Sequence, residues 1–248
     1  MRIGIITAMP EETRAVVRAI NGARKSLING FVVRQGSCAA HVVVIAEAGM
    51  GFQNATAATA RLIHEFSLDM IVSAGFCGGV SPKLQVGDVV VATGLTVVSE
   101  KGLDDVPVKI TAFGRDFVAS QADEGRRVFG GLFASTPVIM HKKLLASRLP
   151  PATPYPVVEM ESAAIALLAG ENGIPFVGLR TVSDACDEEL GFALNEFCDD
   201  RMRIRIPRVL LTVARKPRII PQLIRLARNS RVAAASLSQA VERFLVVV

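Results

Sequence analysis

The chain has 248 residues with a formal net charge of +5, and 50% of its residues are hydrophobic while 21% are charged. A chain of this length and composition can bury a sizeable core, which excludes intrinsic disorder. Its mean hydropathy of +0.40 is high, but no uninterrupted apolar run reaches the roughly 18 residues that a membrane span needs.

Cysteine spacing and the amino-terminal segment indicate the compartment. The four cysteines form no CxxC pair and have no histidine cluster nearby, so we expect neither a disulfide framework nor a bound metal. The opening MRIGIITAMPEE has too short an apolar run for a secretory signal. With no Trp and one Tyr, base stacking on aromatic residues is not favoured. We therefore expect a cytoplasmic protein that binds no metal and no nucleic acid.

Short apolar runs alternate with helical patterns through the first 200 residues, which predicts an α/β fold. Strands rich in Val and Ile are expected at Arg2–Thr7, Phe31–Gln35, His41–Glu47, Met70–Ser73, Asp88–Thr93, Pro156–Glu159 and Phe176–Val182. Helical patterns cover Glu11–Ile20, Asn54–Phe66, His141–Arg148 and Met160–Asn172. Residues Leu95–Phe133 contain five glycines, and we expect them to form an irregular, mobile flap.

The composition changes after residue 200. Eleven basic residues oppose Glu242 alone between 201 and 248, whereas 17 basic and 22 acidic residues give the first 200 a net charge of −5. Prolines divide this tail into a short helix and a longer amphipathic, basic one, which would pack on the acidic body or contact an anionic partner such as lipid or nucleic acid. We predict a catalytic domain over residues 1–200 and a basic helical extension over 201–248. The body is expected to fold without residues 218–248.

Three carboxylates follow predicted strands. Glu12, Glu161 and Asp184 each stand where a strand gives way to a turn or helix. Ligands of open α/β sheets bind beyond the carboxyl ends of the strands, so the three would converge on one crevice. The alternative is that each caps a helix or occupies its first turn. The segment SAGFCGGV at 73–80 allows close backbone approach to a ligand, or a tight turn.

Together these segments resemble a known family. The matching stretches are IGIITAMPEE, EAGMGFQNATAATA, SAGFCGGVSPKLQVGDVVVA and VVEMESAAIALLAGENGIPFVGLRTVSDACDEE. Over roughly the first 190 residues the chain resembles the family-1 nucleoside phosphorylase superfamily, and above all its methylthioadenosine/S-adenosylhomocysteine nucleosidase branch. The resemblance implies a three-layer fold with a mixed central β-sheet flanked by helices. It also implies no cofactor and assembly as a homodimer or higher homo-oligomer.

The resemblance assigns roles to the carboxylates. Glu12 matches the glutamate that activates water to attack the anomeric carbon. Glu161 matches the one that hydrogen-bonds the ribose hydroxyls, with Met160 packing against the sugar. Asp184 matches the acid that protonates or hydrogen-bonds N7 of a departing purine, and Ser183 orients it. Carboxylates near the ring would stabilise a cationic, oxocarbenium-like sugar during the cleavage.

Two parts of the expected site depart from the family pattern. The glycine turn with Gly75 and Gly78 carries Phe76 where relatives have a small serine that holds the nucleophile, which puts that contact in doubt. Phe76 would narrow the site or turn into the core. The segment expected to contact the base lacks the usual phenylalanine, and Val138 and Ile139 are the candidates there.

The same residues distinguish hydrolysis from phosphorolysis. Phosphorolysis needs guanidinium groups on phosphate oxygens, yet Ser73 stands where hexameric phosphorylases carry an arginine, and Glu12 would repel phosphate. We therefore predict a purine (adenosine-type) nucleosidase that cleaves the N-glycosidic bond of a 5′-substituted adenosine with water. The alternatives are a phosphorylase that binds phosphate through Arg34, and a catalytically weak nucleoside-binding protein.

The tail carries a second resemblance. The stretch PRVLLTVARKPRIIPQLIRLARNSRVAAASL is similar to the C-terminal extension of the hopanoid-associated nucleoside phosphorylases. That similarity implies a lipid-linked nucleoside such as adenosylhopane as substrate, and peripheral contact with the inner membrane face through the basic helix. A soluble 5′-thioadenosine or another nucleoside is the alternative.

Overall fold

The computed structural model describes residues 1–28, 31–99, 102–107, 111–138, 140–188, 197 and 206–248. Strand β1 (Arg2–Thr7) pairs in parallel with β4 (His41–Glu47) on one side and with β5 (Met70–Gly79) on the other. Its side chains from Ile3 onward are buried, as expected for a strand covered on both faces. Strands β2 (Asn21–Ile28) and β3 (Phe31–Cys38) extend the sheet antiparallel beyond β4.

The second half of the sheet closes on itself. Strand β5 pairs with β9 (Val157–Glu159) and β10 (Phe176–Asp184), and β6 (Val89–Ser99) and β8 (Val128–Ser135) complete a ring between them. The short strand β7 (Gly102–Asp105) pairs with β6 outside the ring. Because β1, β5 and β10 are parallel, their carboxyl ends meet at one edge. The antiparallel β9 pairs with the last residues of β5, which brings its end to the same edge.

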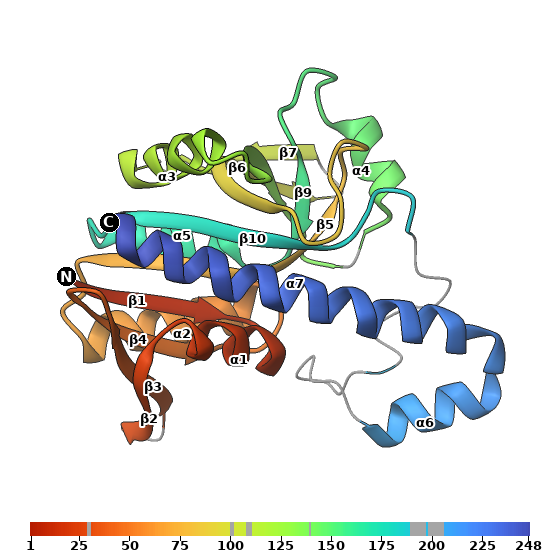
Figure 1. The fold of residues 1–248 in the computed structure, drawn as a ribbon. Helices are drawn as coiled ribbons and strands as arrows, with labels where there is room; N and C mark the ends of the chain where they lie inside the picture. Colours follow the sequence, from red (N-terminus) through yellow and green to blue (C-terminus); the bar gives the residue numbers. More distant parts are fainter. Residues whose placement is uncertain (29–30, 100–101, 108–110, 139, 189–196, 198–205) are drawn as a thin grey trace.

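Helices cover both faces of the sheet (Figure 1). Helices α1 (Pro10–Arg18), α3 (Ala112–Asp123) and α7 (Ile220–Val247) share one hydrophobic core with the sheet, and α2 (Phe52–Glu65) and α5 (Ser162–Glu171) share the other. Helix α4 (Lys142–Arg148) packs Leu145 into a smaller core. Helix α6 (Ile206–Arg215) and a 3₁₀ turn (Pro217–Ile219) precede α7. This architecture confirms the predicted three-layer α/β fold with a mixed central sheet.

The expected helices and most of the expected strands are observed, with bounds that differ by a few residues. The prediction of an irregular flap at Leu95–Phe133 is wrong. That stretch completes β6 and contains β7, α3 and most of β8. Its glycines permit close packing. A Cβ at Gly130 would lie 2.7 Å from Thr93 Cγ2, and one at Gly131 would collide with the Tyr155 carbonyl. Similarly, Gly75 and Gly78 lie inside β5 rather than in a turn.

The second half of α7 belongs to the main core. Its buried residues are Ala233, Leu237, Ala240, Val241, Phe244 and Leu245. The ring of Phe244 meets Phe117 of α3 edge-on at 5.6 Å. This packing argues against the expectation that residues 218–248 are dispensable for folding, because their loss would remove Phe244 and expose Phe117. The domain boundary expected at residue 200 lies outside the described residues and stays a prediction. None of the described helices is both long and apolar enough to span a bilayer.

Candidate active site

A buried arginine organises the candidate site. Arg180 lies on β10 opposite Gly75 of β5 and is 1% exposed. Its Nη2 lies within hydrogen-bonding distance of four acceptors, which are Glu159 Oε2 (2.6 Å), Ser162 Oγ (3.1 Å), Ser73 Oγ (3.2 Å) and Glu161 Oε2 (3.3 Å). A charge removed from water needs such partners. We call Arg180 with Glu12, Glu159 and Glu161 the carboxylate cluster.

Glu12 is fixed from two directions. Its Oε2 accepts hydrogen bonds from the backbone N–H groups of Ala8 (2.8 Å) and Met9 (2.9 Å), and its Oε1 accepts one from that of Phe76 (2.7 Å). Met9 precedes α1, so the helix-capping alternative holds in part. The bond to Phe76, however, reaches across to β5. Burial raises the pKa of Glu12, although Arg180 and the three backbone donors act against that rise.

The geometry at Phe76 resolves the doubt about this position. Its side chain is buried in the core shared with α1 and α7, so it turns away instead of narrowing the site. Its backbone N–H donates a hydrogen bond to Glu12 Oε1. A backbone donor is independent of side-chain identity, so the bulky residue leaves the Glu12 contact in place.

Glu161 precedes α5 and is shared between two donors. Its Oε1 accepts a hydrogen bond from the backbone N–H of Gly51 (2.8 Å), and its Oε2 contacts Arg180. Burial raises the pKa of Glu161 to about 7, with Arg180 lowering it and the charges of Glu159 and Glu12 raising it. Glu161 is therefore poised to exchange a proton near neutral pH.

Glu159 is the permanent counterion of Arg180. Burial alone would raise its pKa, but Arg180, the Ser135 hydroxyl and the backbone N–H groups of Ser162 and Glu161 together lower it. Neither Glu159 nor Arg180 was among the site residues predicted from the sequence. The available signal was a charged residue in the otherwise apolar stretch FVGLRTV of a buried strand, which needs a buried partner.

Asp184 ends β10 and forms a second group with Ser183 and Lys142. Its Oδ1 lies 2.7 Å from Ser183 Oγ, and its Oδ2 accepts a hydrogen bond from Lys142 Nζ at 2.6 Å. Ser183 Oγ also lies 3.2 Å from the Cys77 carbonyl. Lys142, the first residue of α4, was missed by sequence analysis. Its signal was a cation at a helix N-terminus, where the helix dipole disfavours positive charge.

The carboxylate cluster and Asp184 lie near two positions of β5. A Cβ at Gly75 would lie 2.6 Å from Glu12 Oε1 and closer still to Arg180, whereas one at Gly78 would lie 3.0 Å from Asp184 Oδ2. Gly75 and Gly78 are three positions apart along β5, which corresponds to about 10 Å. Cys77 lies between these two glycines, and charges from both groups act on its thiol. Burial raises the thiol pKa, Arg180 lowers it and Asp184 raises it. Glycines at both positions leave room for charged groups.

The other predicted residues are less well placed. Met160 is half-buried between Glu159 and Glu161. Val138 lies beyond β8 and is 62% exposed, so the structure does not bring it into the carboxylate cluster, and Ile139 lies outside the described residues. Arg34 on β3 has its Nη1 3.8 Å from Glu47 Oε2.

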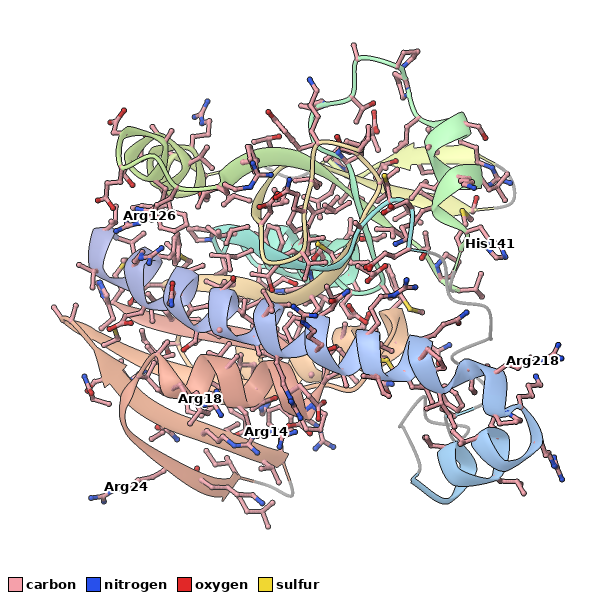
Figure 2. All side chains as sticks on the ribbon, turned by 45° about the vertical axis from the view of Figure 1, so that its right-hand side comes forward. Arg14, Arg18, Arg24, Arg126, His141 and Arg218 are labelled. Carbon is pink, nitrogen blue, oxygen red and sulfur yellow. The ribbon has the colours of Figure 1, made fainter. Side chains whose placement is uncertain are left out.

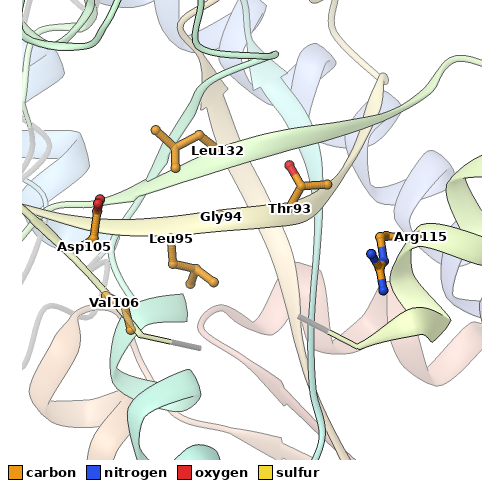
Figure 3. A pocket seen from close by; sticks show the side chains of 7 residues that line it. All are labelled: Thr93, Gly94, Leu95, Asp105, Val106, Arg115 and Leu132. Carbon is orange, nitrogen blue, oxygen red and sulfur yellow. The ribbon is translucent and has the colours of Figure 1, made fainter. Parts of the chain in front are cut away.

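A separate hollow of about 470 Å³ lies beside β6 (Figure 3). Its lining residues are Thr93, Gly94, Leu95, Asp105, Val106, Arg115 and Leu132. None of them belongs to the carboxylate cluster or to the predicted site. Within the described ranges, no group of three or more His, Cys, Asp or Glu residues is placed to hold a metal ion.

Comparisons with known proteins place the chain in a family. The family model described as "Phosphorylase superfamily" matches residues 2–215. A 5′-methylthioadenosine/S-adenosylhomocysteine nucleosidase of Actinobacillus succinogenes is 32% identical over 213 residues, which are 79% of this chain and 91% of that protein. The solved nucleosidase of the same name from Helicobacter pylori superposes with a TM-score of 0.74 at 20% identity, covering 98% of this chain and 97% of the other. Futalosine hydrolase of Helicobacter pylori gives 0.73 at 20% identity, with the same coverage. The chain therefore belongs to the phosphorylase superfamily and, within it, groups with the 5′-methylthioadenosine/S-adenosylhomocysteine nucleosidases.

Proposed function

We propose that this protein is a purine nucleosidase that uses water to cleave the N-glycosidic bond of a 5′-substituted adenosine. The observation that carries the proposal is Glu12, a buried carboxylate held by three backbone N–H groups beside Arg180 and Glu161. A carboxylate fixed in this way is oriented to act on a water molecule before any substrate arrives. The relatives named above support the reaction class.

The proposed steps follow from the placement of each group. Glu12 takes a proton from water as the oxygen attacks the anomeric carbon, and burial makes its carboxylate a stronger base than an exposed one. Glu161 hydrogen-bonds the ribose hydroxyls, and Met160 packs against the sugar. As the C–N bond breaks, Asp184, oriented by Ser183, gives a proton to N7 of the departing adenine. The anionic groups around the ring stabilise the positive charge that develops on the sugar.

The charges of the site favour water over phosphate. In the described part of the chain, Arg180 is the guanidinium of the cluster, and its Nη2 is occupied by carboxylates. Arg34 faces Glu47, and Ser73 contacts Ser162 and Arg180 instead of supplying a cation. An incoming phosphate would meet the carboxylates of Glu12 and Glu159, and the guanidinium of the cluster, Arg180, is already bound to carboxylates.

The test is an assay of 5′-methylthioadenosine and S-adenosylhomocysteine with and without inorganic phosphate. We expect adenine release at the same rate in both, with a free sugar as the second product. Adenine release that requires phosphate and yields a sugar 1-phosphate would overturn hydrolysis in favour of phosphorolysis. Adenine binding without turnover of any 5′-substituted adenosine would make the protein a nucleoside-binding protein.

We further propose that the 5′-substituent is lipid-linked, and that α6 and α7 face the membrane. The first half of α7 exposes Ile220 and Ile224, the latter by 65%, beside the exposed Arg225 and Arg228. Figure 2 shows Arg218 at the outer end of this helix pair, away from the body. Apolar and basic residues on one surface suit an anionic bilayer.

This surface connects to the candidate site through Glu188. Glu188 Oε2 accepts hydrogen bonds from the Ala185 backbone, directly after Asp184, and from Asn229 of α7, and its Oε1 lies 3.4 Å from Arg225 Nε. A hollow of about 540 Å³ lies here, lined by Val86, Glu188, Pro221, Ile224, Arg225, Arg228, Asn229 and Val232. A substrate whose 5′-group extends toward α7 would pass from the site to the bilayer.

Vesicle binding and a matched pair of variants test this second proposal. We expect Ile224→Glu to weaken salt-sensitive binding to anionic vesicles and to slow cleavage of a vesicle-embedded 5′-alkyl adenosine. Val246→Glu, at an equally exposed site (64%) near the other end of the same helix, should change neither. If wild-type protein ignores vesicles and cleaves only soluble nucleosides, the membrane proposal is wrong, and the nucleosidase proposal is unaffected.

A further inference from the structure

The ammonium group of Lys142 is placed behind the carboxyl group of Asp184. The Lys142 side chain is 7% exposed, whereas that of Asp184 is 26% exposed. Lys142 Nζ donates to Asp184 Oδ2 at 2.6 Å and also contacts the carbonyl oxygens of Asp184 and Ala185. The lysine therefore lies on the protein side of the pair, and the carboxyl group is the more accessible partner.

The fold gains little from this pair as a structural element. A lysine removed from water loses its hydration, and an apolar side chain of similar volume is often as stabilising or more so. Lys142 also opens α4, where the N-terminal end of the helix dipole opposes its charge. Gly78 gives the pair space, because a Cβ there would lie 3.0 Å from Asp184 Oδ2 and 3.4 Å from Lys142 Cδ. Lys142 is thus a buried cation that costs desolvation energy, and it lies beside the proposed acid, Asp184.

We propose that Lys142 is a positioning residue for the acid that protonates the leaving group. It holds the Asp184 carboxyl group and supplies the proton which that group passes to the purine. The proposal rests on the nucleosidase function proposed above. It explains how Asp184, already paired with a cation, acts as an acid. Lys142 touches the purine only through Asp184, so its part in the reaction is indirect.

The proton balance is simple. When the glycosidic bond breaks, its electron pair goes to the purine. The carboxylate of the ion pair receives a proton from Lys142: an N–H bond of the ammonium breaks, its electron pair stays on Nζ, and an O–H bond forms at Asp184 Oδ2. N7 takes this proton as the base departs, which leaves Asp184 as a carboxylate again. The neutral amine regains a proton from solvent once the purine has left. No oxidant, reductant or metal ion takes part.

The experiment compares two leaving groups. Adenine needs a proton to depart, whereas 4-nitrophenolate from a 4-nitrophenyl riboside does not. We expect Lys142→Met to lower kcat for the adenosine substrate by about 10²-fold, the usual size of a lost proton-transfer partner, but kcat for the nitrophenyl riboside by less than about 3-fold. Equal losses on both substrates would assign Lys142 a structural role and overturn the inference. The exposed neighbour Lys143 supplies the matched control, Lys143→Met, with wild-type kcat expected.

Two further variants keep the test decisive if the nitrophenyl riboside is a poor substrate. In an Asp184→Asn background, Lys142→Met should slow adenine release by no more than about 3-fold, because residues that act as one unit are not additive. A second full loss would refute the coupling. Lys142→Arg should keep the wild-type Tm but should not restore adenine release, because a guanidinium does not give up its proton. Full restoration by Arg would overturn proton supply. Failure of the wild-type protein to release adenine contradicts the proposed function instead.

Discussion

Gly75 is the position where a single methyl group should disable the site. A Cβ on Gly75 would lie 2.6 Å from Glu12 Oε1, 2.8 Å from Glu12 Cδ, and closer still to Arg180 Nη1. Neither neighbour is free to move. Glu12 is held by three backbone donors, and Arg180 is held through Nη2 by two carboxylates and two hydroxyls.

The cost of Gly75→Ala follows from these contacts. Overpacking of a rigid core costs typically about 1–3 kcal/mol, and partial loss of a buried ion pair moves the total toward about 3–5 kcal/mol. In a chain of this size each kcal/mol lowers Tm by about 2–4 °C. We therefore expect Gly75→Ala to lower Tm by roughly 6–20 °C. It should also lower adenine release by at least about 10²-fold, because a displacement of about 1 Å at Glu12 misdirects its water.

Gly170→Ala is the matched control. Gly170 lies within α5 and would place its Cβ in open space, so the same change there should raise stability by up to about 1 kcal/mol and leave turnover unchanged. Thermal unfolding by circular dichroism and an adenine-release assay measure both effects. A Gly75→Ala protein with wild-type Tm and wild-type turnover would refute the close packing of Glu12 and Arg180 against β5.

Three further predictions concern the acids and the last helix. Glu12→Gln and Asp184→Asn should each lower turnover by about 10²-fold or more. Calorimetry should show that adenine binding survives Glu12→Gln better, because Asp184 is the group proposed to contact the base. The raised pKa of Glu161 means that its contribution to the free energy of unfolding is present below its ordinary value of 4.5 and is lost as the pH rises to about 7; urea unfolding of Glu161→Gln should show a smaller decline over that range than wild type. Phe244→Ala should destabilise the protein by about 3–5 kcal/mol, whereas Val246→Ala on the exposed face of α7 should stay within about 0.5 kcal/mol of wild type.

The predictable part of the fold is the part whose signals are local. Runs of Val and Ile mark β1, β4 and β10, and the helical pattern over residues 160–172 marks α5. Local patterns do not predict the strands and helix of residues 95–133, because the glycines there allow close contacts with residues distant in the sequence. Gly131, for example, packs against Tyr155. Such a requirement exists only after the chain has folded.

The residues of the candidate site also fall into two groups, those predicted from the sequence and those recognised only in the structure. Glu12 lies in the first turn of the helix after β1, Glu161 follows β9, and Asp184 ends β10, so the sequence alone predicts that each lies at or just after a strand end. Arg180 and Lys142 carry weak sequence signals, but their partners are known only once β5 and β10 have paired and α4 has packed beside them. The amphipathic pattern of α7 predicted an apolar partner, but it did not show that the second half of the helix is buried in the main core while Ile224 stays exposed.

The charge balance of the carboxylate cluster indicates which state of the reaction it stabilises. Three carboxyl groups surround one guanidinium, and burial raises the pKa values of Glu12 and Glu161 even though Arg180 lowers both. The cluster therefore disfavours full ionisation, in which three negative charges and one positive charge would give it a net charge of −2. A neutral nucleoside supplies no positive charge, but the oxocarbenium-like sugar of the proposed cleavage supplies one. Stabilisation is then greatest in the transition state, which is the condition for catalysis rather than tight substrate binding.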